Sequence, residues 1–260
     1  MLLRGALDAG AAAAARAEVL DRLAAVGEIA APAEAAIATG KSNRAALHPD
    51  LGAFWRSVCE GTALRHLTHG PAMRAVAQAM IGEDAVPFDF LWLRAMLPGR
   101  ASPLHFDHVY MNRGSARIVT FWVPLGDVPI AAGPIVVVEG SHRFADLAEA
   151  YRGHDVDRDP SRPGSLAVDA LSLAAQRGCR LLSADFRAGD VLAFGMFTLH
   201  GSLDNAMSGD RIRLSADIRW QPAGDARDGR WFGAPPPGHG GKSYGGLNGA
   251  LPLGAPGIAR

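Results

Sequence analysis

The chain has 260 residues, of which 48% are hydrophobic and 20% charged, and its 26 Lys plus Arg balance its 26 Asp plus Glu. This composition excludes a largely disordered chain, and the lack of net charge argues against a nucleic acid or an anionic membrane as a partner. No stretch approaches the roughly 20 apolar residues that span a bilayer, and Cys59 and Cys179 form no CxxC pair that would indicate a disulfide framework or a thiolate zinc site, so we expect a cytoplasmic protein that acts on a small molecule.

The first third of the chain is predicted to be mainly helical. Residues 8–26 are rich in Ala, Leu, Arg and Glu, and their larger apolar residues recur at helical spacing, which predicts an amphipathic helix that can cover a sheet. Residues 31–49 contain Pro, Gly, Ser and Asn and are predicted to form a loop. Shorter helices are expected at 51–59 and at 72–81, the second opening at Pro71 in a first-turn position.

After Asp84 the pattern changes to short apolar and aromatic runs that are separated by Gly, Pro, Asp and Ser turns. Helices are expected at 144–151 and 167–176, with the polar segment 153–164 exposed between them. A helical start followed by short strands is typical of a mainly β fold, a jelly roll with flanking helices. The strands are predicted at 88–96, 104–111, 117–125, 134–138, 180–186, 190–195 and 211–220.

We expect one domain in three parts, because an all-β fold of this length commonly forms a single unit. The parts are a helical segment at about 1–84, a jelly-roll core at about 85–222 and a tail at about 223–260. The tail holds clustered Pro and Gly and should either wrap around the body or be partly disordered. The sequence does not indicate an oligomeric state.

Three residues are candidates for holding a metal ion. His105 and Asp107 lie two apart in a predicted strand, so their side chains point to the same face and can reach a single ion. His200 follows Asp107 by 93 positions and offers a third ligand. Two histidines and a carboxylate on one face of an ion leave the other face open, as in non-haem Fe(II) oxygenases. The alternative is that His105 and His200 are ordinary surface or core histidines among nine.

Four segments strengthen the metal hypothesis, because in order and spacing they resemble the phytanoyl-CoA dioxygenase family over about residues 85–222. The segments are Pro103–His108 (PLHFDH), Val119–Pro129 (VTFWVPLGDVP), Gly133–Arg143 (GPIVVVEGSHR) and Phe186–Leu192 (FRAGDVL). The resemblance implies a double-stranded β-helix with Fe(II) on the three candidate ligands. It also implies 2-oxoglutarate as co-substrate, O2 as oxidant, and hydroxylation of a small organic or natural-product-like molecule with release of succinate and CO2.

The resemblance also suggests which residues hold 2-oxoglutarate. In this family an arginine about eleven residues after the distal histidine binds the far carboxylate, and Arg211 occupies that position. Ser202, two residues after the histidine, is expected to assist. A guanidinium suits the task because its planar fork matches a carboxylate. Arg94 is a further candidate for a carboxylate of co-substrate or substrate, with a salt bridge at the rim as its alternative.

The last predicted strand leaves the arginine assignment ambiguous. By period two, Arg211 shares one face with Arg213, Ser215, Asp217 and Arg219, while the other face is apolar. If the polar face points outward, Arg211 is only a surface residue. We expect the face to point inward, with Arg211 as the anchor and Arg213 as its substitute.

Two other classes of function compete with the oxygenase. A cupin-like metal-dependent isomerase or hydrolase would need a fourth protein ligand and no 2-oxoglutarate arginine. A catalytically silent family member would serve as a binding protein. Halogenation is disfavoured because Asp107 is present where related halogenases carry a small residue. Substrate choice is expected to depend on loops 38–49 and 153–165. Most family members begin with a helix and a complete strand before the segment that Leu2–Gly5 finishes, so the start of the sequence is expected to be truncated.

Overall fold

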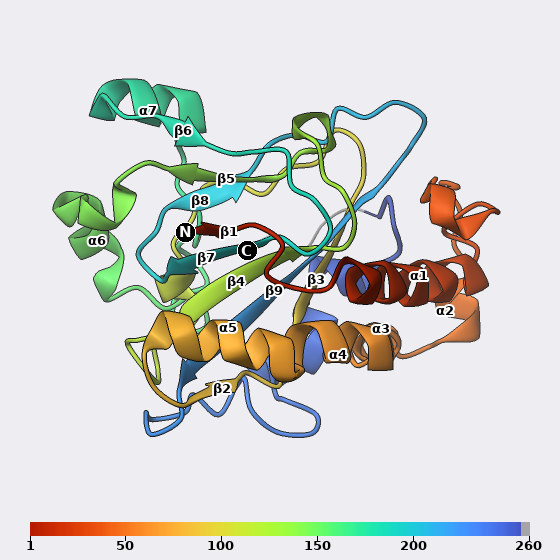
Figure 1. The fold of residues 1–260 in the computed structure, drawn as a ribbon, viewed down its shortest axis with the longest axis horizontal. Helices are drawn as coiled ribbons and strands as arrows, with labels where there is room; N and C mark the ends of the chain where they lie inside the picture. The colour runs from red at the N-terminus through yellow and green to blue at the C-terminus, as the bar shows by residue number, and fades with distance from the viewer. Residues whose placement is uncertain (256–260) are drawn as a thin grey trace.

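The computed structural model describes residues 1–255 and shows two antiparallel sheets that face each other (Figure 1). The large sheet has the order β1 (Leu2–Leu3), β7 (Val191–Gly195), β4 (Val119–Pro124), β9 (Arg213–Pro222), β2 (Ala85–Pro87), and β3 (Trp92–Met96) also pairs with β9. The small sheet has the order β6 (Leu181–Leu182), β5 (Ile135–Val138), β8 (His200–Ser202). The predicted jelly roll is therefore the observed fold.

Helices cover the outer face of the large sheet (Figure 1). They are α1 (Ala9–Ala25), α3 (Leu51–Cys59), α4 (Thr62–His69) and α5 (Pro71–Ile81), whereas the short helix α2 (Arg44–Leu47) lies beyond the sheet at the end of this layer. The Asp8 carboxylate caps α1 by accepting from the Ala11 amide, and α5 opens at Pro71 and ends at Gly82, whose φ of 85° suits glycine. The three predicted N-terminal helices are confirmed. α4 was not predicted, because its sequence holds only two leucines between polar residues.

The large sheet has one apolar and one polar face along β9. Leu214, Ala216, Ile218 and Trp220 join the core beneath the helices. The alternating residues, among them Arg213 and Arg219, are buried as well, and they point toward the small sheet. The inward orientation expected for the polar face is thus confirmed for the residues of β9.

The strand predicted at 104–111 is wrong. His105 forms only isolated antiparallel bridges, one with Ser165 and one with His200. In the second bridge His105 N–H donates to His200 O at 2.9 Å and His200 N–H donates back at 3.2 Å. The chain then turns through a short 3-10 segment, Asp107–Val109. It leaves the ladder there because the Asp107 side chain is held by Thr120 and Arg219 of the opposite sheet. The small strand β8 was not predicted, and the strand expected at 180–186 shrinks to Leu181–Leu182.

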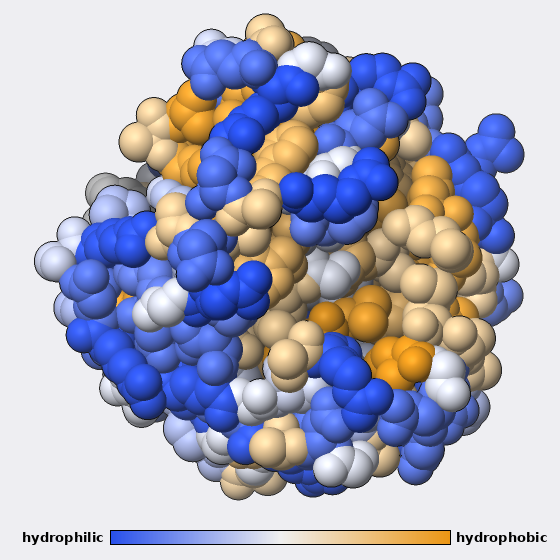
Figure 2. All heavy atoms as spheres, turned by 90° about the vertical axis from the view of Figure 1, so that its left-hand side faces the viewer, coloured by the Kyte–Doolittle hydropathy of each residue, from blue (hydrophilic) through white to orange (hydrophobic). Residues whose placement is uncertain are grey.

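The last two helices lie at one end of the small sheet. They are α6 (Ala145–Arg152) and α7 (Ala170–Arg177), close to the predicted ranges, and a small apolar cluster that includes Phe106, Val138 and Leu173 lies beneath them. Figure 2 shows this side of the molecule, where apolar side chains lie between polar ones. Leu171 of α7 is 75% exposed.

The tail wraps the body as far as the structure describes it. Trp231 and Tyr244 are fully buried, and the Tyr244 ring stacks on Phe90 with centroids 4.3 Å apart. The Tyr244 hydroxyl also accepts from the Leu91 amide at 3.0 Å. The final part of the predicted tail, residues 256–260, lies outside the described residues.

No helix in the described part of the chain has the length and apolarity to cross a bilayer. Both Cys59 and Cys179 are free thiols, in agreement with the expectation that no disulfide framework exists.

Candidate metal centre

His105, Asp107 and His200 meet between the two sheets, and all three are buried. Asp107 Oδ1 lies 3.8 Å from His105 Nε2 and 3.9 Å from His200 Nε2. One potential ligand atom from each residue lies within 4.8 Å of the others, and within residues 1–255 this is the cluster able to hold a metal ion. His200 lies 93 positions after Asp107 and 95 after His105, and the three residues are brought together because His105 and His200 pair through their backbones.

Both histidines present Nε2 toward the common point. Their Nδ1 atoms face backbone carbonyls, that of Pro103 at 2.9 Å from His105 and that of Thr198 at 2.9 Å from His200. A hydrogen bond from Nδ1–H to a carbonyl selects the tautomer in which Nε2 carries the lone pair. Burial, and then the neighbouring His200, lower the pKa of His105 to about 3, and burial also lowers the pKa of His200. Neutral imidazoles are the form that binds metal.

The Asp107 carboxylate is held by two residues of the large sheet, Arg219 and Thr120. Arg219 Nη2 donates to both of its oxygens, at 3.1 and 3.0 Å, and the Thr120 hydroxyl donates to Oδ2 at 2.5 Å. Burial alone would raise the pKa of Asp107, but Arg219, the two histidines and Thr120 hold it below its usual range. The carboxylate is therefore charged and fixed in orientation.

Arg219 and Thr120 were not predicted from the sequence as partners of the metal ligand Asp107. A signal was present for Arg219, since it shares the inward face of β9 with Arg213. Thr120 could have been noticed as a polar residue within the apolar run of β4, Val119–Pro124, where the neighbouring side chains are apolar.

The donor set fits a divalent transition metal. Two imidazole nitrogens and one carboxylate oxygen approach one point from one side, and the geometry leaves the other side for exchangeable ligands. Second contacts to each donor, from Pro103, Thr198, Thr120 and Arg219, match the pattern by which proteins orient metal ligands.

A narrow recess lies directly beside the triad. It is lined by Arg94, Ser102, His105, Trp122, Ile135, His200, Gly201, Ser202, Arg213 and Asp217. Arg213 is 3% exposed, and its Nη1 donates to the Ser215 hydroxyl at 2.5 Å, whereas its Nε has no hydrogen-bond partner within residues 1–255. Burial, and then nearby Arg94, lower the pKa of Arg213 to about 10. A buried guanidinium in this state suits an anionic ligand.

The three residues expected to bind 2-oxoglutarate have different surroundings. Ser202 lines the recess, and its Oγ accepts from the Ser102 amide at 2.7 Å. Arg94 also lines it, and its Nε donates to Asp217 at 2.6 Å. Burial alone would lower the pKa of Arg94, but Asp217 and then Asp107 raise it above its ordinary value.

Arg211, the expected anchor, is exposed and does not line the recess. It precedes the first residue of β9, and its carbonyl accepts from Asn205 Nδ2 at 2.9 Å. The turn that ends at Gly209 and Asp210, both with positive φ, delivers the chain to β9 two residues later than the sequence pattern suggested. Arg213, named as the substitute, is the arginine of this pair that faces the metal centre.

A larger cleft of about 450 Å³ leads away from the metal centre. Its floor includes His105, Asp107 and Arg219, and its walls come from β3, from Trp55 and Tyr110, and from residues 247–255. Of the two loops expected to determine substrate choice, 153–165 contributes Ser165, and no residue of 38–49 lines the cleft.

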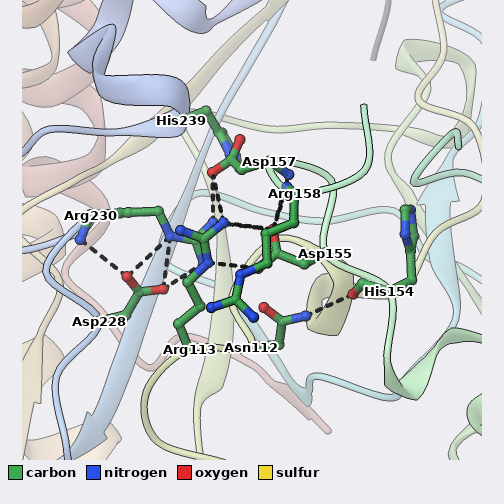
Figure 3. A network of polar contacts seen from close by, with 9 residues as sticks. All are labelled: Asn112, Arg113, His154, Asp155, Asp157, Arg158, Asp228, Arg230 and His239. Atoms are coloured by element: carbon green, nitrogen blue, oxygen red, sulfur yellow. Dashed lines mark hydrogen bonds and ion pairs between the residues drawn. The ribbon is translucent and has the colours of Figure 1, made fainter. Parts of the chain in front are cut away.

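Figure 3 shows a network of ion pairs, which reaches the wall of the cleft at His239. Arg113 Nε donates to Asp155 at 2.6 Å, and Arg230 Nη1 donates to Asp157 at 2.7 Å. The other oxygen of Asp157 lies 3.0 Å from Nδ1 of His239, a residue of the cleft wall. The network thus joins the segment after α6 to the C-terminal part of the chain.

Comparison with known proteins gives a consistent result. The family described as phytanoyl-CoA dioxygenase (PhyH) matches residues 2–213. No curated protein matches the sequence.

Solved structures share the fold at low sequence identity. The epimerase SnoN in complex with Fe3+, alpha ketoglutarate and nogalamycin RO is 21% identical, with a TM-score of 0.56 over 88% of this chain and 81% of its own. EctD from S. alaskensis with 2-oxoglutarate and 5-hydroxyectoine is 20% identical, with a TM-score of 0.56 over 90% of this chain and 75% of its own. The non-heme monooxygenase ThoJ is 21% identical, with a TM-score of 0.51 over 84% and 72%.

Proposed function

The chain belongs to the phytanoyl-CoA dioxygenase family, and from this premise we propose that it is a non-haem Fe(II) and 2-oxoglutarate-dependent dioxygenase. We propose further that it hydroxylates a small organic molecule. The observation that carries the proposal is the combination of a one-sided His-Asp-His cluster with a buried arginine beside it.

The three ligands have separate tasks in this proposal. His105 and His200 would hold Fe(II) through Nε2, and Asp107 would hold it through Oδ1, with Arg219 and Thr120 keeping the carboxylate in place. Iron bound there would supply the activation of O2 that couples oxidative decarboxylation of 2-oxoglutarate to oxidation of the substrate.

Arg213 and Ser202 would bind the far carboxylate of 2-oxoglutarate. Both line the recess beside the histidines, and Arg213 keeps a guanidinium nitrogen without a protein partner among the described residues. The Ser202 oxygen already accepts from Ser102, so its hydroxyl hydrogen is available to donate to the carboxylate. Arg94 would support the recess by holding Asp217 rather than by binding the co-substrate directly.

The residues of the cleft would position the substrate beside the metal centre and exclude water from it. The substrate would enter through the 450 Å³ cleft, whose floor is the metal centre. We propose hydroxylation because an intact carboxylate ligand, Asp107, occupies the position that a halogenase leaves open. The expectations of a small-molecule partner, no nucleic acid, no membrane and a cytoplasmic location are retained as part of this proposal.

The test begins with anaerobic protein that is loaded with Fe(II) and titrated with 2-oxoglutarate. We expect the weak visible charge-transfer band of a chelated iron centre, and we expect its loss in His200→Ala. Asp107→Ala should abolish the formation of succinate in air while the far-ultraviolet circular dichroism stays unchanged.

Arg213→Ala and Arg211→Ala form a matched pair for the co-substrate site. Arg213→Ala should lower the affinity for 2-oxoglutarate by roughly 30-fold or more, because the buried carboxylate of the co-substrate loses its charge-assisted partner. Arg211→Ala should bind it like the wild type. The reverse result would return the anchor to Arg211. If no band forms in folded, iron-loaded protein, the cupin-like or the silent alternative replaces the oxygenase.

A further inference from the structure

One wall of the large cleft is built from the C-terminal part of the chain. Residues lining it there include Leu247, Gly249, Leu251, Pro252 and Leu253. The family match ends at residue 213, so this wall comes from outside the matched region. It faces β3, whose residues from Trp92 to Met96 line the cleft on the other side.

The walls are mainly apolar. Aliphatic and aromatic side chains of both walls, including Trp55, Trp92, Met96, Leu251 and Leu253, line the cleft. The charged side chains of the described lining are Asp107, which belongs to the metal centre, and Arg94, Arg100 and Arg219. Arg219 is held by Asp107 and Arg94 by Asp217, so both of these arginines already have a carboxylate partner. A volume of about 450 Å³ lies in the range of small-molecule sites, which bury ligands largely through apolar contacts.

A fully buried ion pair holds this wall from behind. Arg44 and Glu28 have no exposed side-chain surface, and Arg44 Nη2 donates to Glu28 at 2.6 Å. Arg44 Nη1 lies within hydrogen-bond distance of three successive carbonyls, those of Gly249, Ala250 and Leu251, at 3.0, 3.1 and 2.7 Å. Glu28 Oε2 in turn accepts from the Leu253 amide at 3.2 Å.

The hydrogen bonds of Arg44 and Glu28 to this wall are directional, whereas apolar packing is not. A guanidinium that donates to a carboxylate and to several carbonyls fixes both the distance and the rotation of the segment that it holds. Trp55 adds a steric limit, because a Cβ at Gly249 would lie 2.5 Å from its ring. Segment 38–49, which was expected to be a loop and contains α2, therefore influences the cleft through Arg44, although none of its residues lines the cleft.

We propose that residues 247–253 form the wall that selects the substrate, that the substrate has an apolar body, and that the buried Glu28–Arg44 pair positions this wall. The inference rests on the proposed function for the identity of the cleft as a substrate site. Arg44 and Glu28 are positioning residues, since neither lines the cleft.

The test uses N-phenyl-1-naphthylamine, a neutral apolar dye that fluoresces on leaving water, with the anaerobic Fe(II) and 2-oxoglutarate form of the full chain. We expect saturable binding of one dye per chain, with energy transfer from tryptophan because Trp55 and Trp92 line the cleft. Leu251→Asp should lower the affinity for the dye by about tenfold, since a carboxylate replaces apolar contact surface. Leu171→Asp makes the same change at an exposed site on α7 and should leave dye affinity unchanged.

A second pair of variants tests whether the buried Glu28–Arg44 pair positions the wall. Arg44→Lys retains the charge but loses the planar fork, and Glu28→Gln retains the shape but loses the charge. Each variant should lower the affinity for the dye by roughly threefold to tenfold. The affinity for 2-oxoglutarate, measured from the charge-transfer band, should stay within about twofold of the wild type. Arg180→Lys, in an exposed pair with Glu139, is the matched control and should change neither affinity.

The outcomes separate the two proposals. Unchanged dye affinity in Leu251→Asp, or failure of the wild type to bind the dye, overturns the substrate wall while the charge-transfer band still supports the oxygenase. Unchanged dye affinity in both Arg44→Lys and Glu28→Gln overturns the positioning role of the Glu28–Arg44 pair. Absence of the band overturns the proposed function, and the dye comparison in iron-loaded protein then still decides whether the wall binds apolar molecules.

Discussion

At the scale of single residues, the charge of Asp107 depends on what surrounds it. Asp107 is 1% exposed, and burying an ion without a partner is costly. Arg219 and Thr120 offset this cost on one side, and a metal ion would do so on the other. Arg219 is itself placed over the face of Trp92, 4.2 Å from the ring centroid, so its position is defined by packing as well as by charge.

This arrangement predicts the effect of Arg219→Met. The variant keeps much of the apolar stem but removes both hydrogen bonds to Asp107, so metal affinity should fall by about 10- to 100-fold, as for other partners of metal ligands. Titration with Fe(II) under argon measures this. Arg94→Met removes an arginine that contacts Asp217 instead of a ligand, and it should bind Fe(II) like the wild type. Equal metal affinity in the two variants would show that Arg219 does not support the centre.

At the scale of elements, the segment after α6 is tied to distant parts of the chain by charge. Asp155 and Asp157 accept from Arg113 and Arg230 (Figure 3). Burial alone would raise the pKa of Asp157, but His239 and Arg230 lower it below its usual range. Burial opposes ionisation of Asp155 too, yet Arg113 lowers its pKa overall.

The sign of the pH dependence follows from these shifts. A carboxyl group whose pKa is lower in the folded chain stabilises the fold above its unfolded pKa of roughly 4, and this contribution is lost as the pH falls toward the folded pKa. Asp157→Asn should therefore reduce the free energy of unfolding by about 1 to 2 kcal/mol at pH 7, where the hydrogen-bonded charge is lost. The difference from wild type should narrow below about pH 4.

Urea unfolding between pH 7 and pH 3 tests this prediction. Asp146→Asn is the control, because Asp146 pairs with Arg177 at the surface and its loss should leave stability unchanged at both ends of the range. A gap between Asp157→Asn and wild type that is constant with pH would mean that packing, not ionisation, accounts for the effect.

At the scale of the whole molecule, the metal centre joins the two sheets. His200 belongs to the small sheet, whereas Thr120 and Arg219, which hold Asp107, belong to the large one. A ligand that binds the folded chain and not the unfolded one stabilises it by mass action. Metal binding should therefore stabilise the entire fold and not only the loop that carries Asp107.

We predict that anaerobic Fe(II) at 100 times its Kd raises the free energy of unfolding by roughly 2.7 kcal/mol. Thermal unfolding with and without the ion, followed by circular dichroism, measures the change, and excess chelator should reverse it. His200→Ala should show no such increase. A rise in Tm that persists in that variant would place the stabilising ion elsewhere.

The sequence alone determined much of the fold and the candidate ligands. Helical spacing placed α1, α3 and α5 within a few residues of their observed bounds, because amphipathic periodicity and caps are local properties. The identity of His105, Asp107 and His200 as a cluster came from motifs and their order, and the structure brings these three residues together. Their local structure was less well predicted, since His105 forms isolated bridges with Ser165 and His200 and does not lie in a full strand.

Only the tertiary structure decided which arginine faces the metal centre, which residues hold Asp107 and which residues form the walls of the cleft. Arg211 and Arg213 lie on the same face by period two, and a shift of two residues moves the side chain about 7 Å along a strand without changing its face. The choice between them depends on where the turn before β9 ends. The contacts of Arg219 with Asp107 and of Arg44 with Gly249 span 112 and 205 positions, and no local pattern encodes pairing over such distances, because it arises only when the sheets and the tail pack together.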